Sequence, residues 1–455
     1  MKPNILFFLI DTFRADKFFG CEKTSVTPNI DKLIKNGTYF SQAIGSSDGT
    51  ILSLSGLFTG LHPFKTGIMA PNYKKIDPNT KTFFSILKTQ GYHFYGNLPK
   101  INESLGIFPK WENKDYAYDY YWNLSEGLGE KIIELLESKK MTSPWFYYIH
   151  IEDLHFPIVL EKKFSDDKFG TSKYEKKVSA IDEWIGKIIE KIDSNNTLVI
   201  FTADHGHYIK AVSNNNLNIN LEVNGETQTL VRNIGNKIPK KIHPVTLKLF
   251  LLLEKIRKKR KNQKIKNLEL TNYEKRALLW QRSDLEHFLF DEIVKIPLLF
   301  YGYNIKKNLK ISEQVRLIDI FPTIFDIIQI KNDFQSIDGQ SLMPLIEGEI
   351  IKEQPAVIET HYSIELKSLD KIGIRTSNYK YFRDKDDPTQ RIHLYNLKND
   401  PHENYNIANN NSEIVNKMEN LLQEILHKSS EIKNNEFTEE ETKMIEDELK
   451  KLGYV

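Results

Sequence analysis

Four short, continuously apolar segments show that the chain alternates between buried strands and helices. The segments are Ile5–Ile10, Trp145–Ile151, Thr197–Thr202 and Ile296–Tyr301. Runs of this kind are typical of strands covered on both faces, as parallel strands between helices are. Apolar residues at helical spacing lie between them, over Asn29–Asn36, Glu130–Ser138 and Tyr174–Ile192. We therefore expect an α/β fold, with a mostly parallel central sheet sandwiched by helices.

The pattern changes toward the C-terminus. Segments Gly373–Phe382 and Ile392–Leu397 alternate apolar and polar residues and are joined by polar turns, which indicates antiparallel strands. Beyond Asn409 the chain is charged and helical in pattern. The sequence predicts a large α/β domain over residues 1–350, a small antiparallel subdomain over 351–410 and a charged helical tail over 411–455.

Residues 211–286 interrupt the large domain and are expected to form an inserted, lid-like segment. Within it, residues 245–253 are apolar and residues 255–266 are strongly basic. An apolar run followed by a basic run can lie at a membrane surface or hold an anionic ligand, so membrane contact through 245–266 is one interpretation. The simpler alternative is a solvated helix end on the inserted segment.

Composition narrows the class of partner and compartment. The 63 Lys and Arg residues nearly cancel the 61 Asp and Glu residues of the 455-residue chain, so we expect no nucleic-acid partner. Cys21 is the only cysteine, which excludes an intrachain disulfide and a cysteine-rich metal site. The apolar run Ile5–Ile10 is too short for a signal peptide, and no stretch reaches the ~18 apolar residues of a membrane span. The sequence predicts a cytoplasmic protein.

Two acidic residues directly follow two of the predicted strands. Asp11 ends the strand Ile5–Ile10, and Asp204 follows Thr197–Thr202. Ligands of open α/β sheets bind beyond the carboxyl ends of the strands, so these carboxylates are candidate ligands of one divalent ion. His205 stands beside Asp204, and ions such as Zn²⁺ and Mn²⁺ also accept imidazole. Either aspartate alone fits equally well as the N-cap of the helix that follows its strand.

These residues stand among motifs that together resemble the sulfatase family of the alkaline-phosphatase superfamily. The first motif runs from Asp11 to Asp16, and Gly20-Cys21 and Thr27–Leu33 follow in the order that the family has. Further segments that are similar to family motifs are Leu57–Pro63, Phe290–Glu292 before Ile296-Pro297, Asp319–Thr323, Asp338–Leu342, Arg375–Tyr381 and Leu394–Glu403. The resemblance covers nearly the whole chain except the insertion and the tail.

The resemblance implies an alkaline-phosphatase-like fold and one bound divalent ion, which is Mn²⁺, Zn²⁺ or Ca²⁺. The implied metal ligands are Asp11, Thr50, Asp204 and His205. A second ion in this superfamily needs a further aspartate and two histidines. The candidates for it are Asp153, His155 and His287, whose spacing fits poorly, and we expect a single ion.

The resemblance also implies residues that contact the substrate. His155 and His287 match positions that contact the transferring group, and His155 can assist the leaving group. Asn97 falls near a lysine of many sulfatases, so that contact is lost or altered here. For His150, a substrate contact and a core histidine with satisfied hydrogen bonds remain open.

Thr50 occupies the position at which the resemblance implies the nucleophile. The best-known sulfatases carry Cys or Ser there, followed by x-Pro-Ser-Arg, whereas this chain keeps Ser53 and has Leu52 and Leu54 in place of Pro and Arg. The threonine β-carbon bears a methyl group, so the residue cannot be oxidised to formylglycine. We expect a metal-held threonine alkoxide instead. The alternative is that Thr50 is only a helix N-cap.

Three functions are compatible with this pattern. The first is a metal-dependent hydrolase that cleaves a sulfate ester, a phosphate diester or a phosphonate through Thr50 and a covalent intermediate. The second is a phosphotransferase that moves a phospho-group onto a glycan or lipid. The third is a non-catalytic binder of an anionic glycan. The first two imply an anionic ester substrate, which can be glycan- or lipid-linked.

Overall fold

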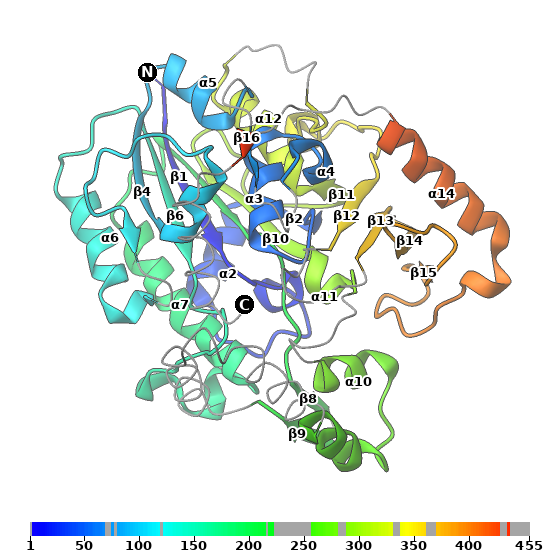
Figure 1. Ribbon diagram of the computed structural model, residues 1–455. Helices are drawn as coiled ribbons and strands as arrows, with labels where there is room; N and C mark the ends of the chain where they lie inside the picture. The colour runs from blue at the N-terminus through cyan, green and yellow to red at the C-terminus, as the bar shows by residue number, and fades with distance from the viewer. Residues whose placement is uncertain are drawn as a thin grey trace, which may run out of the picture.

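An eight-stranded sheet forms the centre of the molecule (Figure 1). The computed structural model describes residues 2–68, 74–76, 80–118, 122–214, 217–222, 256–280, 288–330, 337–360, 370–427 and 435–436. The strand order is β11-β2-β10-β7-β1-β6-β4-β5. In that order the strands span Leu309–Arg316, Gly37–Ile44, Lys295–Gly302, Thr197–Thr202, Asn4–Ile10, Trp145–Ile151, His93–Pro99 and Ala117–Tyr118.

The central sheet is mostly parallel, which confirms the predicted α/β class. Strand β1 pairs in parallel with β6 on one side and with β7 on the other. Strand β10 runs antiparallel to both of its neighbours, β7 and β2. The apolar sequence of β10 indicates that both faces of the strand are buried. A strand can be buried in this way whether it runs parallel or antiparallel to its neighbours. The prediction of a strand over Ile296–Tyr301 is confirmed, whereas its antiparallel direction is specified only by the structure.

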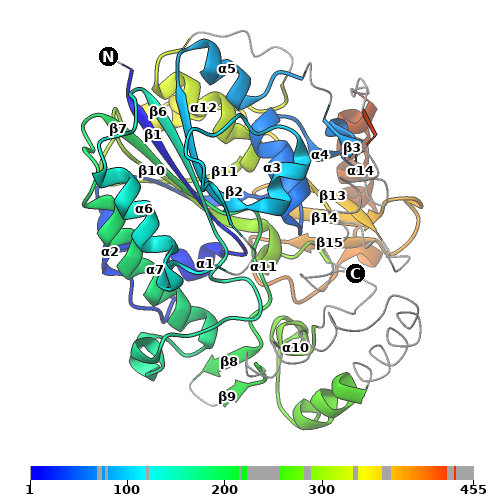
Figure 2. The same cartoon turned by 60° about the vertical axis from the view of Figure 1, so that its left-hand side comes forward.

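Helices cover both faces of this sheet (Figure 2). On one face lie α2, α6 and α7, which span Pro28–Lys35, Leu128–Glu137 and Lys173–Ile189. On the other lie α3, α5 and α12, which span Thr50–Thr59, Phe83–Thr89 and Ile320–Ile327. The three predicted helices correspond to α2, α6 and α7, with ends that differ by one to three residues because helix ends fray.

Alternate residues of β1 point to opposite faces of the sheet, as in any strand. The Phe7 ring lies 6.1 Å from the Phe58 ring of α3, and the Phe8 ring stacks on Phe201 at 4.4 Å on the other face. Because side chains alternate in the same way along the neighbouring strands, only every second residue of those strands points to the face of the sheet on which α3 lies.

A second, antiparallel sheet of four strands follows in the chain, in the order β12-β13-β14-β15. Its strands span Ala356–Glu359, Lys371–Arg375, Tyr379–Asp384 and His393–Asn396. Strands β13 to β15 match the predicted alternation, whereas β12 was not predicted. Helix α14 (Ser412–His427) packs on this sheet, where the Tyr381 hydroxyl donates to Glu419 Oε2 at 2.8 Å. The divisions at residues 350 and 410 stay predictions.

The remaining helices and strands are short. They are α1 (Ala15–Phe18), α4 (Pro63–Thr66), β3 (Lys74–Lys75), α11 (Asp291–Val294), α13 (Met343–Glu347), β16 (Asn435–Glu436) and the 3₁₀ turns Lys100–Leu105, Leu124–Glu126, Lys162–Phe164, Asp167–Phe169, Leu317–Asp319 and Ala408–Asn410. Among the described residues, none of the helices is both long and apolar enough to cross a bilayer.

The predicted insertion contains a small unit of its own. Strands β8 (Ala211–Asn214) and β9 (Leu217–Asn220) form a hairpin, and residues 256–265 and α10 (Asn272–Leu279) are helical. Ile265, Leu270 and Leu278 are buried there. Residues 223–255 and 281–287 lie outside the described residues, so the apolar part of 245–266 and His287 cannot be placed.

A buried arginine joins the two sheets. Arg375 of β13 is 2% exposed and donates to both carboxylate oxygens of Asp291, at 3.0 and 2.9 Å. It also donates to Gln314 Oε1 at 2.8 Å and to Gln42 Oε1 at 3.1 Å on the central sheet. Burial opposes ionisation of Asp291, but the charges of Arg375 and Lys380 and the hydrogen bonds from Arg375 together hold the Asp291 pKa well below its usual range.

We predict that Arg375→Leu destabilises the fold by about 3–5 kcal/mol, because it removes the bidentate one of the two cations that pair with the buried Asp291 carboxylate, the other being Lys380. Urea unfolding followed by tryptophan fluorescence measures this loss. Lys163→Gln is the matched control, since Lys163 pairs with Glu183 at the surface and is 62% exposed. Equal losses for the two variants would contradict the role assigned to Arg375.

Candidate active site

The carboxyl ends of β1 and β7 bring two aspartates together. Leu9 of β1 lies opposite Thr202 of β7 in the parallel register, so Asp11 and Asp204 leave the sheet side by side. Both side chains are buried. Ligand atoms of Asp11, Asp204 and His205 all lie within 4.8 Å of one another. The structure thus gathers three of the predicted metal ligands at one point.

Two carboxylate oxygens of this cluster are buried without compensation. Asp11 Oδ1 and Asp204 Oδ2 have no hydrogen-bond partner within the described parts of the chain. Burial, and then the charge of Asp11, raise the pKa of Asp204. Two adjacent buried carboxylates repel each other, and a divalent cation between them removes that repulsion. The donor set, two carboxylates and an imidazole, fits such an ion.

His205 is oriented to offer a lone pair to the same point. Its Nδ1 lies 2.8 Å from the Gly206 carbonyl oxygen, which can only accept, so Nδ1 carries the proton. The other ring nitrogen, Nε2, lies 3.5 Å from Asp204 Oδ2 and 3.9 Å from Asp11 Oδ1. This tautomer is the one that a metal-ligating histidine requires.

Close packing explains why glycine follows His205. The Gly206 N–H donates to the Ile293 carbonyl at 2.6 Å, and a Cβ at this position would lie 2.1 Å from the Glu292 carbonyl oxygen. The loop after β7 is therefore pressed against α11. In the sequence, only the family resemblance connected the Phe290–Glu292 motif with the site. In the structure, this motif packs against the loop Asp204–Gly206.

Thr50 is the first residue of α3 and faces the cluster. Its Oγ1 lies 3.3 Å from Asp11 Oδ2 and 3.4 Å from His205 Nε2. Gly49 occupies the N-cap position, so the alternative that Thr50 is only an N-cap is wrong. The loop before Thr50 is attached to the C-terminal sheet, since the Glu359 N–H donates to the Ser46 carbonyl at 3.1 Å.

His150 lies behind Asp11 and is fully buried. The Tyr148 hydroxyl and the Asn102 amide nitrogen lie 2.9 and 3.0 Å from its Nδ1, and both can donate to it. The proton then resides on Nε2, which lies 3.6 Å from Asp11 Oδ2. Ligand atoms of Asp11, His150 and Glu152, all of them buried, also lie within 4.8 Å of one another. We expect His150 to act on the site through Asp11, as a positioning residue.

Asn97 lies on the other face of the sheet. It pairs with Ile149, whose side chain points away from the face of Tyr148 and His150. Its Oδ1 accepts from the Tyr147 hydroxyl at 2.5 Å. Asn97 is therefore not brought to the cluster. Asn102, five residues further on, is brought to it instead, and nothing in the sequence pattern distinguished the two.

His155 follows β6 and lies at the edge of the cluster. Its Nδ1 is 3.0 Å from the Phe156 carbonyl oxygen. Burial alone would raise the pKa of Asp11, but the neighbouring side chains of His150, His155 and His205 lower it below its usual range. His155 is thus electrostatically coupled to Asp11.

Asp153 is turned away from this point. It pairs with Lys177 of α7 at 3.4 Å and accepts from the Leu124 N–H at 3.1 Å. Burial raises its pKa to about 6, and the charge of Lys177 only partly offsets that rise. Asp153 therefore cannot share a second ion with His155 in this conformation, and His287 lies outside the described residues.

Arg14 ties the loops of the site together. It forms a bidentate pair with Asp16, at 2.8 and 2.7 Å, and its Nη2 donates to the Tyr273 hydroxyl of α10 at 2.9 Å. Its Nη1 lies 3.4 Å from the His207 carbonyl oxygen, in the loop that carries His205. The first motif thus links the loop after β7 to the inserted unit.

We predict that His150→Phe weakens metal binding about 10- to 100-fold, because it removes the imidazole nitrogen that lies 3.6 Å from Asp11 Oδ2 while keeping a ring in the core. Isothermal titration of the metal-free protein with Mn²⁺ measures the affinity. Asn97→Leu is the control, since it alters a buried polar residue on the opposite face. An unchanged Mn²⁺ affinity in a folded His150→Phe protein would exclude the positioning role.

Comparison with known proteins agrees with this geometry. The Sulfatase family model matches residues 3–330, and the model for the C-terminal part of N-sulphoglucosamine sulphohydrolase matches residues 284–430. Arylsulfatase K of Mus musculus is 22% identical over 93% of this chain and 79% of its own length. The ulvan-active sulfatase of Formosa agariphila is 23% identical over 90% of this chain and 76% of its own.

Solved structures share the fold. A putative sulfatase from Bacteroides fragilis has a TM-score of 0.65 at 17% identity, covering 94% of this chain and 96% of that one. The phosphonate monoester hydrolase of Agrobacterium radiobacter has a TM-score of 0.66 at 14% identity, with the same coverage of 94% and 96%. Since the family model spans well over half of the chain and the cluster lies within it, the protein belongs to the sulfatase family.

Proposed function

We propose that this sulfatase-family hydrolase cleaves an anionic ester through Thr50 as the nucleophile. The observation that supports this best is the position of Thr50 Oγ1, 3.3 Å from Asp11 Oδ2 and 3.4 Å from His205 Nε2. The two carboxylate oxygens that have no hydrogen-bond partner among the described residues, Asp11 Oδ1 and Asp204 Oδ2, belong to the same cluster. A nucleophile beside its activating charge is the arrangement that covalent catalysis needs.

Asp11, Asp204 and His205 are proposed to hold a single divalent ion, with Thr50 as a further ligand. When bound, the ion would lower the pKa of the Thr50 hydroxyl and neutralise charge on the transferring group. Mn²⁺, Zn²⁺ and Ca²⁺ remain the candidates.

The proposed reaction has two displacement steps at one centre. In the first, the Thr50 hydroxyl releases its proton to solvent and Oγ1 attacks the sulfur or phosphorus atom, the bond to the ester oxygen breaks, and the departing alcohol takes a proton from His155. In the second, water loses a proton to His155 and attacks the same atom, the bond to Thr50 Oγ1 breaks, and sulfate or phosphate is released. Thr50 Oγ1 then regains a proton from solvent, which restores its hydroxyl. The N-terminus of α3 adds favourable electrostatics for the anion.

A sulfate ester on a glycan is the leading substrate class. Relatives include an ulvan-active sulfatase, and one structural neighbour with a TM-score of 0.61 was solved with a neocarrahexaose. A phosphate diester or phosphonate is the second candidate. It is favoured by Thr50 itself, which cannot form formylglycine, and by the likeness in fold to a phosphonate monoester hydrolase.

Transfer to a glycan or lipid and non-catalytic glycan binding remain alternatives. A panel of p-nitrophenyl sulfate, bis-(p-nitrophenyl) phosphate and p-nitrophenyl phenylphosphonate at matched metal loading separates them from hydrolysis. Turnover only on addition of an acceptor alcohol would favour the transferase, and no turnover with metal bound would favour the binder. The cytoplasmic location expected from the sequence also stays a prediction.

We predict that Thr50→Ala lowers kcat/KM for the best substrate of the panel by roughly 10³-fold or more, because the attacking oxygen is lost. Thr50→Ser keeps that oxygen and should retain a measurable part of the activity. Initial rates at saturating Mn²⁺ check both variants. Activity of Thr50→Ala close to that of the unmodified chain would exclude Thr50 as the nucleophile.

We predict that Asp204→Asn lowers the bound metal from about one ion per chain to nearly none, because a charged ligand becomes neutral. Metal content after gel filtration, measured by plasma mass spectrometry, reports this directly. Asp326→Asn is the control, because Asp326 is an exposed acid of α12. Equal metal content in both variants would refute the assignment of the metal site.

A further inference from the structure

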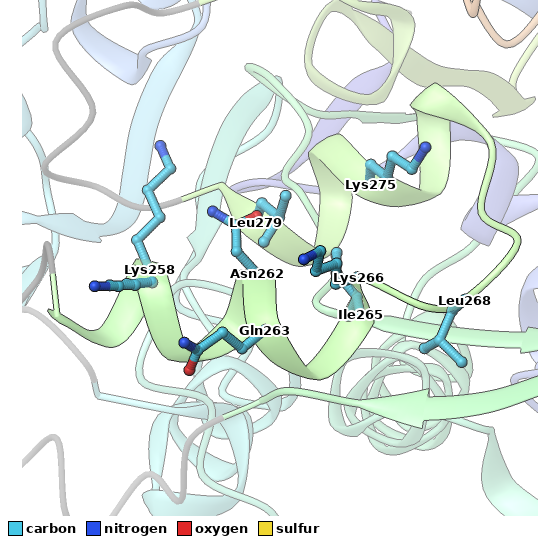
Figure 3. A pocket seen from close by; sticks show the side chains of 9 residues that line it. Lys258, Asn262, Gln263, Ile265, Lys266, Leu268, Lys275 and Leu279 are labelled. Carbon is cyan, nitrogen blue, oxygen red and sulfur yellow. The ribbon is translucent and has the colours of Figure 1, made fainter.

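A pocket on the inserted unit is lined by four lysines, two amide side chains and the apolar residues Ile265, Leu268 and Leu279. It has a volume of about 540 Å³ and lies between helix 256–265 and α10. Figure 3 shows Lys258, Asn262 and Gln263 on the first helix, Lys266 just beyond its end and Lys275 on α10. This volume is in the range of pockets that hold small ligands or a few sugar units.

The segment that carries this pocket is strongly basic, and four of its lysines line the pocket. Residues 256–279 contain nine lysines and arginines and two glutamates, whereas the whole chain has a net charge of only +2. Lys259, Lys266 and Lys275 are exposed. Such a concentration attracts an anionic partner and holds it in a salt-dependent way.

The polar side chains of the pocket favour a hydroxylated anion over a membrane. Asn262 and Gln263 offer amide donors and acceptors, which suit sugar hydroxyl groups. Membrane-binding helices present large apolar side chains beside their basic residues. Among the described residues of this unit, Ile256 is the one large apolar side chain classed as exposed, at 41%.

The unit borders the same edge of the sheet as Thr50. Strand β8 begins at Ala211, six residues after His205, and α10 is bound to Arg14 through Tyr273 at 2.9 Å. The Trp280 ring, at the end of α10, lies 5.1 Å from the His207 ring. A polymer held by the unit can therefore also extend toward the cluster.

We propose that this pocket is a binding site for a sulfated glycan chain, which it holds through sulfate groups that are not being cleaved. The lysines pair with the sulfates and the two amides bind the sugar hydroxyls. The proposal rests on the proposed function in that the glycan is taken to be the substrate, but the binding itself requires no turnover.

The test uses the full chain and a fluorescein-labelled heparin dodecasaccharide as the probe. We expect Lys259→Gln/Lys266→Gln/Lys275→Gln to raise the Kd from fluorescence anisotropy roughly tenfold near 0.1 M salt, and to flatten its salt dependence. Asn262→Ala/Gln263→Ala should weaken binding without changing the salt dependence, because no charge is removed. The control Lys35→Gln/Lys307→Gln/Lys398→Gln removes the same charge from exposed positions elsewhere.

Turnover of the best small p-nitrophenyl ester should be unchanged in the pocket variants. This readout separates failure of the pocket from failure of the proposed function. Heparin binding that is equal in the pocket variant and the control overturns the proposal. Binding to vesicles of phosphatidylcholine and phosphatidylserine, with no binding of heparin, also overturns it and assigns the surface to a membrane.

Discussion

The repulsion between two buried carboxylates is the constraint around which this molecule is organised. Asp11 and Asp204 follow neighbouring parallel strands in the same register, so their carboxylates lie beside each other at the carboxyl edge of the sheet. Two of their oxygens remain uncompensated within the described residues. A fold tolerates such a cost where a cation or a reacting group supplies the missing interaction.

The surrounding structure holds these carboxylates in place from several directions. The Thr12 N–H donates to Asp204 Oδ1 at 3.2 Å, and His150 lies behind Asp11. Thr12 has a positive φ of 58°, a conformation that costs a β-branched residue free energy. The Tyr174 hydroxyl donates to the Thr12 carbonyl at 2.7 Å and stabilises this turn. Backbone strain and hydrogen bonding thus meet at the turn beside the two candidate ligands.

Distant parts of the chain converge on the same loops. Helix α11 supports the loop of His205, and β12 of the second sheet contacts the loop that leads to Thr50. The inserted unit reaches Arg14 through Tyr273. The family-like segments after residue 290 therefore contribute to the site by supporting its loops, which explains why motifs without obvious chemistry accompany the ligands.

The sequence by itself determined the α/β class, most of the buried strands, and a ligand set whose members the structure brings together. The spacing of apolar residues predicted the strands and helices, and the acidic residues at the strand ends predicted the ligand set. The family motifs supported both predictions. Only the tertiary structure decided that β10 runs antiparallel and that Asp153 pairs with Lys177. It also decided that Asn102, and not Asn97, lies near the cluster. The direction of a strand, the sheet face to which a side chain points and the partner of a buried charge all depend on contacts between segments far apart in the chain. A local pattern of apolar and polar residues is the same for each alternative, so it cannot distinguish them.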